Sequence, residues 1–283
     1  MNTLKLRSQL EQFFNEDIGD QDITSDLIFS KGVMGEVEFI AKEEGIFCGE
    51  DIIKYGYKLL NEQIQVHVNV KDGDFIQVGQ ILATASGEIS DLLKGERVIL
   101  NLVQRMSGIS TITKKAVQEI DSSTTKLCDT RKTSPGLRMF EKYAVRCGGG
   151  FNHRYGLYDG VMIKDNHISF AGSITNAVKR VREKLGHMIK IEVEIETVEQ
   201  LIEAIEAKVD VIMLDNRSPE EIKQWMGYVP EGIITEASGG ITLNNLAAYG
   251  KTGVHYISLG FLTHSFKALD ISVKVGACQR GEE

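Results

Sequence analysis

The chain has 283 residues, of which 42% are hydrophobic and 25% charged, which is enough for two domains or one large barrel with an appendage. Its net charge of −8 argues against general binding to nucleic acid or anionic membranes, because both need basic surfaces. Early acidic residues exclude a signal peptide, no apolar run reaches the ~20 residues of a membrane span, and four scattered cysteines without C-x-x-C spacing are typical of reduced thiols. We therefore expect a soluble, cytoplasmic protein.

The first part of the chain predicts a domain with an antiparallel sheet. An amphipathic stretch from Leu4 to Phe14 predicts a helix, and residues 33–40 and 64–70 alternate apolar with polar side chains. Such alternation indicates strands with one solvated face. Asp72-Gly73 predicts a tight turn after the second strand. Apolar residues at helical spacing from Asp91 onward predict a long helix that leads out of this domain.

The rest of the chain repeats a pattern of strand, loop and helix. Short apolar strands are expected at residues 126–128, 161–163, 189–195, 209–214, 232–235 and 254–259. Helical patterns follow at residues 138–145, 173–185, 198–207, 219–226 and 243–248, with Thr197, Ser218 and Thr242 as candidate N-caps. Successive βα units with buried strands indicate a parallel sheet. Six strands are fewer than the eight of a closed barrel, so we predict an incomplete barrel, with a doubly wound open sheet as the alternative.

The window from Asp129 to His167 is net +3 in an otherwise acidic protein. Its cations are Arg131, Lys132, Arg138, Lys142, Arg146, Arg154 and Lys164. Arginine forks match carboxylates and phosphates in bidentate fashion, while lysine supplies a point charge. The window also contains Gly148-Gly149-Gly150, which could simply end a helix, and two histidines. We interpret it as part of a pocket for a small, strongly anionic substrate.

Polar or glycine residues stand at the carboxyl ends of all six predicted strands, where βα barrels carry their active sites. These groups are Asp129–Lys132, Lys164–His167, Glu194, Asp215-Asn216, Glu236–Gly240 and Ser258–Gly260. Chance could place one or two such groups on one rim, but six predict a functional site.

The chemistry of these residues suggests separate roles. Glu194 and Asp215 could hold Mg²⁺ together with waters and substrate phosphates, or they could pair with Lys164 or Lys132 across the rim. Ser238-Gly239-Gly240 and Ser258-Leu259-Gly260 could offer backbone N–H groups to a phosphate, although turn geometry explains a single S-G-G equally well. A lone histidine is more often structural, but His153 lies beside Arg154 in the cationic window, which favours substrate contact. No His/Cys group has zinc spacing.

The motifs together resemble the quinolinate phosphoribosyltransferase family. They are DTRKTSPGLR, KYAVRCGGGFNHR, IKDNH, EVE, LDN, EASGGI and ISLGFLTHS, preceded by ERVILNLVQRMSGIST. The resemblance covers nearly the whole chain. Ser134, where threonine is usual, and Met106 after Arg105 are minor departures that remove no charged group.

The resemblance implies an N-terminal α/β sandwich domain, residues 1–110, and an incomplete α/β barrel, residues 111–266, with residues 267–283 packing back on the first domain. It implies transfer of phosphoribosyl to quinolinate with decarboxylation in de novo NAD synthesis, with Mg²⁺ as cofactor. It further implies a homodimer or a trimer of dimers, with the active site at the subunit interface.

Individual roles also follow from the resemblance. Quinolinate contacts fall on Arg105 (lent by the partner subunit), Arg131, His153, Arg154 and Lys164. Phosphoribosyl and pyrophosphate contacts fall on Lys132, Glu194, Asp215, Ser238-Gly239-Gly240 and Ser258-Leu259-Gly260, with Thr130 also among the substrate-binding residues. Lys132, Lys164, Glu194 and Asp215 are the expected catalytic residues, and Glu194 and Asp215 the expected metal ligands.

Three other functions are compatible with parts of the sequence. The first is a pyrophosphorylase-like relative linked to molybdenum transport, which usually departs from the IKDNH and LDN motifs. The second is an aldolase-type barrel in which Lys132 or Lys164 forms a Schiff base. The third is a non-catalytic anion-binding protein, against which the intact Glu194 and Asp215 argue.

Overall fold

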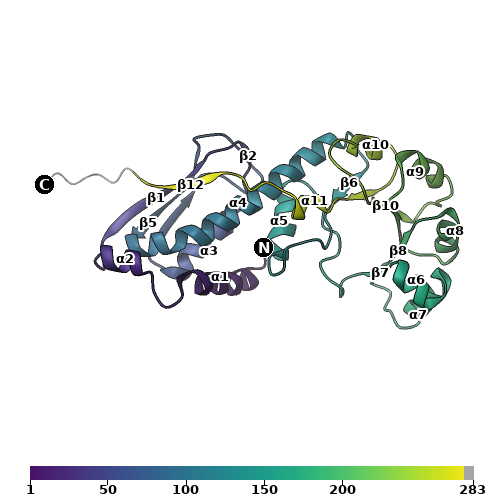
Figure 1. The fold of residues 1–283 in the computed structure, drawn as a ribbon, viewed down its shortest axis with the longest axis horizontal. Helices are drawn as coiled ribbons and strands as arrows, with labels where there is room; N and C mark the ends of the chain where they lie inside the picture. Colours follow the sequence, from purple (N-terminus) through teal and green to yellow (C-terminus); the bar gives the residue numbers. More distant parts are fainter. Residues whose placement is uncertain (277–283) are drawn as a thin grey trace. The chain divides into compact units, whose positions relative to one another are not determined.

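The computed structural model describes residues 1–276, which form two compact units (Figure 1). The first unit combines Met1–Ile112, Met139–Gly148 and the described residues from Phe266 onward, and the second combines Thr113–Arg138 with Gly149–Ser265. The segment Met139–Gly148 thus groups with the first unit, whereas the sequence-based range 111–266 assigned it to the second.

The first unit is built on a four-stranded antiparallel sheet in the order β12-β1-β5-β3. Its strands are β1 (Met34–Ala41), β3 (Gln65–Val68), β5 (Ile81–Glu88) and β12 (Ile271–Val275), and β2 (Gly45–Ile46) and β4 (Phe75–Ile76) form a separate pair. Because β12 pairs with β1, the described part of the C-terminal tail belongs to this sheet. Residues 277–283 of the expected tail lie outside the described residues.

The alternating pattern around β1 places every second side chain in the core of the first unit. Val37, Phe39 and Ala41 are buried, and Phe39 contacts Tyr57 edge to face with ring centroids 6.2 Å apart. The helices that belong wholly or mainly to this unit are α1 (Thr3–Ile18), α2 (Ile23–Ile28), α3 (Glu50–Leu60), α4 (Ile89–Glu119) and α5 (Arg138–Cys147). The predicted long helix is α4, with 31 residues.

The second unit contains a six-stranded parallel sheet in the order β6-β11-β10-β9-β8-β7. Its strands are β6 (Lys126–Cys128), β7 (Val161–Ile163), β8 (Ile191–Ile195), β9 (Val211–Asp215), β10 (Ile234–Ser238) and β11 (Tyr256–Ser258). From β7 to β11 each strand lies beside the one before it in the chain, and β6 follows β11. This single direction confirms the incomplete barrel, because a doubly wound sheet reverses its strand order.

Helices connect the strands of the second unit. They are α6 (Asp165–Ala171), α7 (Ile174–Arg182), α8 (Val198–Glu206), α9 (Pro219–Met226), α10 (Leu246–Gly250) and α11 (Phe261–His264). Thr197 and Ser218 cap α8 and α9 as predicted, by accepting from backbone N–H groups three residues on. The prediction for Thr242 is wrong: α10 begins at Leu246, because the Asn245 side chain accepts from the Thr242 N–H at 2.7 Å and holds a turn there.

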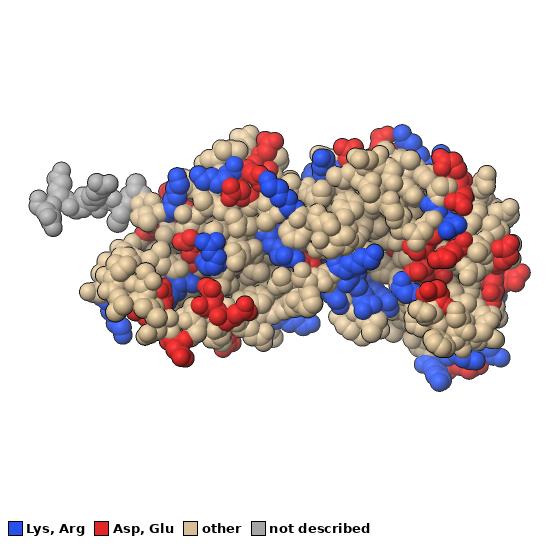
Figure 2. All heavy atoms as spheres, in the orientation of Figure 1, with Lys and Arg blue, Asp and Glu red and all other residues tan. Residues whose placement is uncertain are grey.

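No helix within residues 1–276 combines the length and the apolar character that crossing a membrane requires. Figure 2 shows acidic and basic side chains interspersed on the visible face, with basic side chains gathered in one area of the second unit.

Candidate active site

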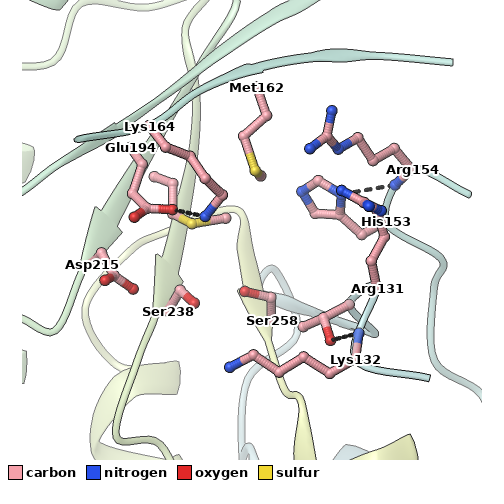
Figure 3. Close-up of a pocket in the computed structure, with 12 residues that line it drawn as sticks. Arg131, Lys132, His153, Arg154, Met162, Lys164, Glu194, Asp215, Ser238 and Ser258 are labelled. Atoms are coloured by element: carbon pink, nitrogen blue, oxygen red, sulfur yellow. Dashed lines mark hydrogen bonds and ion pairs between the residues drawn. The ribbon is translucent and has the colours of Figure 1, made fainter. Parts of the chain in front are cut away.

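A cavity of about 370 Å³ opens at the carboxyl ends of the strands of the second unit (Figure 3). It is lined by Thr130, Arg131, Lys132, His153, Arg154, Met162, Lys164, Glu194, Met213, Asp215, Ser238 and Ser258. Ten of these twelve residues are predicted site residues, which the parallel strands bring to one rim. Met162 and Met213 were missed because apolar residues carry no chemical signal, although each lies two residues before a predicted one and so faces the same side of its strand.

Five predicted site residues do not line this cavity: Arg105, Gly239, Gly240, Leu259 and Gly260. Leu259 is buried, and its N–H donates to the Cys128 carbonyl at 2.9 Å. That N–H was expected to be exposed for a phosphate, so this expectation is wrong: parallel pairing with β6 consumes the group. Arg105 belongs to the first unit, where its Nη2 lies 2.5 Å from Glu141 Oε1 and its guanidinium lies 4.7 Å from the Phe266 ring.

Four cations, together called the cationic wall, lie around the cavity. Arg131, Lys132, Arg154 and Lys164 all line it, and Figure 3 shows their side chains around one space. Burial and the charge of Arg131 both lower the pKa of Arg154. An anion bound between the two guanidiniums would relieve this repulsion, so the wall suits a substrate with more than one negative charge.

A buried carboxylate fixes the loop that carries His153. Asp129 directly follows β6, and its two oxygens accept from Asn152 Nδ2 at 2.6 Å and from the His153 N–H at 2.9 Å. Arg154 is held in turn, because its Nη1 donates to the Gly160 carbonyl at 2.9 Å. The segment Asn152-His153-Arg154 is therefore held in place before any substrate binds.

Glu194 and Lys164 form an ion pair across neighbouring strands, between Oε2 and Nζ. One alternative considered for Glu194, pairing with Lys164 across the rim, is thus present in the structure. The backbone N–H of Lys164 donates to His167 Nδ1 at 3.0 Å, which starts helix α6 directly after the lysine. His167 therefore satisfies the backbone N–H of the N-cap residue of α6.

Asp215 and the glycines of β10 share a tight arrangement at the rim. Asn216 has a positive φ of 53°, and its Nδ2 donates to Asp215 Oδ2 at 2.6 Å. A Cβ on Gly239, whose φ is +84°, would lie 2.2 Å from Asn216 Oδ1. Only glycine fits at this position, and the motif EASGG therefore supports the orientation of Asp215.

Two acids inside the strands were not given roles by the sequence. Glu192 and Glu236 are 6% and 4% exposed, and both approach His153. The sequence pattern predicts that Glu236 lies on the rim after its strand, but Glu236 lies within β10. Their spacing was the available signal, since each lies two residues before a cavity residue, Glu194 or Ser238.

Comparison with known proteins identifies the family. Residues 22–107 match the quinolinate phosphoribosyl transferase N-terminal domain, and residues 109–274 match the C-terminal domain of the same enzyme. The chain belongs to the quinolinate phosphoribosyltransferase family. It is 57% identical over 275 residues to the probable nicotinate-nucleotide pyrophosphorylase (carboxylating) of Bacillus subtilis, covering 97% of this chain and 95% of that protein.

Solved structures of family members have the same fold. NadC from Streptococcus pyogenes is 36% identical with a TM-score of 0.93, and the match covers 97% of both chains. The nicotinate-nucleotide pyrophosphorylase of Francisella tularensis is 39% identical with a TM-score of 0.92, over 98% of both chains. The predicted α/β fold, a sheet domain followed by an incomplete barrel, is confirmed by these likenesses.

Proposed function

We propose that this protein transfers the phosphoribosyl group of phosphoribosyl pyrophosphate to quinolinate and releases pyrophosphate and CO₂. The product is nicotinate mononucleotide, in de novo NAD biosynthesis. The observation that carries the proposal is one cavity, in a member of this family, that combines four cations with Glu194 and Asp215.

Quinolinate is a dianion with adjacent carboxylates, which matches the cationic wall. Arg131, Arg154 and Lys164 are the proposed carboxylate partners, with His153 beside them. Each charged hydrogen bond contributes about 1.5–3 kcal/mol, so the loss of one partner weakens binding severely. Arg105, already paired with Glu141, is the proposed fourth cation and would come from a partner subunit.

Departure of pyrophosphate leaves positive charge on the ribose C1. Lys132 is proposed to neutralise the leaving pyrophosphate. Glu194 and Asp215 are proposed to stabilise the positive charge on the ribose ring. The two carboxylates also fit Mg²⁺, which prefers oxygen ligands and needs few from the protein when phosphates and waters supply the rest. When bound, Mg²⁺ would supply further neutralisation of the phosphates.

Decarboxylation follows from the chemistry of the ribosylated ring. Its cationic nitrogen stabilises the electron pair left at C2 when the adjacent carboxylate departs as CO₂, and a proton from solvent then takes the place of the carboxylate at C2. The residues that hold the ring, Arg131, Arg154 and Lys164, would keep it in place while this happens.

We further propose that the protein works in the cytoplasm as a homodimer or a trimer of dimers. Free thiols at Cys48, Cys128 and Cys147 favour the first point. The membership of Arg105 in the first unit, while every cavity-lining residue belongs to the second, favours an active site completed by a partner.

The test is turnover by the purified protein with quinolinate, phosphoribosyl pyrophosphate and Mg²⁺, followed as nicotinate mononucleotide. Product should require all three components and should not form when nicotinate replaces quinolinate. No product from folded protein would contradict the proposal and favour the relative linked to molybdenum transport or a binding role.

A further inference from the structure

The interior of the barrel holds a layer of acids directly beneath the cavity. Residues two apart on a strand face the same side, and Glu194 and Ser238 line the cavity. Glu192 and Glu236, two residues earlier on β8 and β10, therefore lie one layer deeper. Such layers in barrels are normally filled by bulky apolar side chains, so two buried acids at this level are unusual.

His153 joins these two acids to the cavity, which it also lines. Its Nε2 lies 3.0 Å from Glu192 Oε2 and 3.7 Å from Glu236 Oε2. Its Nδ1 accepts from the Arg154 N–H at 2.7 Å, so the ring proton is on Nε2 and points to the acids. We call His153, Glu192 and Glu236 the acid–histidine cluster.

The cluster is not fully hydrogen-bonded. Within the described residues, Glu192 Oε1 and Glu236 Oε1 are buried and have no hydrogen-bond partner. Such an arrangement is costly for two ionised carboxylates, because each buried charge needs donors or a counter-ion. One proton on Glu236 lowers this cost and leaves Glu192 to accept from the His153 Nε2–H.

The surroundings of Glu236 place that proton on it. Burial and the neighbouring charge of Glu192 raise the pKa of Glu236 to about 7, opposed by His153 and by the side chains of Ser258 on β11 and Cys128 on β6. Arg154 acts electrostatically on Glu192 from the same loop as His153. Met213, the neighbour of Glu236 in register on β9, carries no charge.

We propose that Glu236 is a positioning residue that acts through Glu192 and His153, and that Glu236 takes up a proton when quinolinate binds. This inference rests on the proposed function. A dianion beside His153 makes the electrostatic potential at Glu236 more negative and so favours its neutral form. Glu192 then accepts from the His153 Nε2–H and holds the imidazole facing the substrate.

The coupling has a defined sign. Below about pH 7 Glu236 is already protonated in the free protein, so affinity for quinolinate should not vary through this group. Above that pH each binding event must bring a proton, and affinity should fall by up to about tenfold per pH unit until the higher pKa of the complex is passed.

The experiment compares the wild type, Glu236→Gln and Glu196→Gln. Quinolinate is titrated calorimetrically at pH 7.5 in HEPES and in Tris, whose ionisation enthalpies differ. The kcat/KM for quinolinate is measured from about pH 6.5 to 8.5 at saturating phosphoribosyl pyrophosphate. Glutamine imitates the neutral carboxyl, and the control residue Glu196 is an exposed acid directly after β8, outside the cavity.

The wild type and Glu196→Gln should show buffer-dependent binding heat and a falling kcat/KM above pH 7. Glu236→Gln should lose both and should exceed the wild type in kcat/KM at pH 8.5. Two results would overturn this inference and leave the proposed function standing. One is a wild-type binding heat that does not depend on the buffer. The other is a kcat/KM of Glu236→Gln that is low at every pH and falls with pH as steeply as that of the wild type. Absence of any wild-type turnover would overturn the proposed function, and this inference with it.

Discussion

Each unit contains a polar cluster centred on carboxylates, and the two clusters differ in how completely their oxygens are hydrogen-bonded. In the first unit, Asp72 Oδ1 accepts from the N–H groups of Gly49 and Glu50 at 2.7 and 3.0 Å, and its Oδ2 accepts from Tyr143 Oη at 2.7 Å. In the second unit, Glu192 and Glu236 each keep a buried oxygen without a partner among the described residues.

The difference separates a structural acid from functional ones. Asp72 satisfies the first N–H groups of α3, which no intrahelical carbonyl can reach, and so it stabilises the start of that helix. Glu192 and Glu236 of the second unit lie under a cationic cavity, and each has a buried oxygen that accepts no hydrogen bond from the described residues. A fold retains such a costly arrangement where a ligand or a proton completes it.

The largest expected effect is on the cationic wall. Arg131→Ala should lower kcat/KM for quinolinate about 100-fold or more, because a charged hydrogen bond to the dianion is lost. Its melting temperature should stay unchanged, since Arg131 is exposed. Arg180→Ala, a change of an exposed arginine on α7, is the control and should have near-normal kinetics. Near-normal kinetics of folded Arg131→Ala would remove this residue from the site.

Asp72→Ala should act on stability and leave the chemistry alone. Loss of three hydrogen bonds and of the acid at the start of α3 should cost about 2–4 kcal/mol in the free energy of unfolding. Urea denaturation measures this, with Asp74→Ala as the control in the same turn, where a single bond to the Lys71 N–H is lost. Equal losses in both variants would contradict a special role for Asp72.

Glu236→Gln should make stability less dependent on pH. The fold raises the pKa of Glu236 from 4.5 to about 7. The neutral carboxyl therefore contributes its full stability below pH 4.5, and this contribution is lost as the pH rises through about 7. Between pH 4.5 and 8 the wild type should lose up to about 3 kcal/mol relative to the variant. Parallel stability curves for the two proteins would show that Glu236 titrates normally.

The smallest effect is expected away from both clusters. Ser218 caps α9 by accepting from the Glu221 N–H at 3.2 Å, while Glu221 Oε2 accepts from the Ser218 N–H at 2.8 Å. Ser218→Ala should cost about 1 kcal/mol in thermal or urea unfolding and should leave kcat/KM unchanged. A marked loss of activity at full stability would mean that the end of β9 reaches the site differently.

The sequence predicted the rim of the cavity better than the layer beneath it. Lys164, Glu194 and Asp215 were found because polar residues that end apolar strands meet at one edge of a parallel sheet. Glu236 was placed wrongly because a charged residue near a strand end looks like a rim residue, and only the three-dimensional register puts it inside. The distances from His153 to both acids depend on strands that are far apart in the sequence.

The sequence pattern also did not predict that residues 139–148 group with the first unit. Residues 139–148 follow the first barrel strand in the chain, yet Phe140 contacts Phe13 of α1 with ring centroids 5.9 Å apart. Local periodicity shows that a helix forms there and which face is apolar, but not which core that face enters. The long helix α4 and the alternating strand β1, whose patterns are strong and local, were predicted correctly.

The most direct test of the account uses quinolinate labelled in its 2-carboxylate. With phosphoribosyl pyrophosphate and Mg²⁺, the wild type should release the label as CO₂ in step with pyrophosphate, and Arg131→Ala should release almost none. Label released without phosphoribosyl pyrophosphate, or at an equal rate by Arg131→Ala, would contradict the claim that this cavity holds the ring during transfer and decarboxylation.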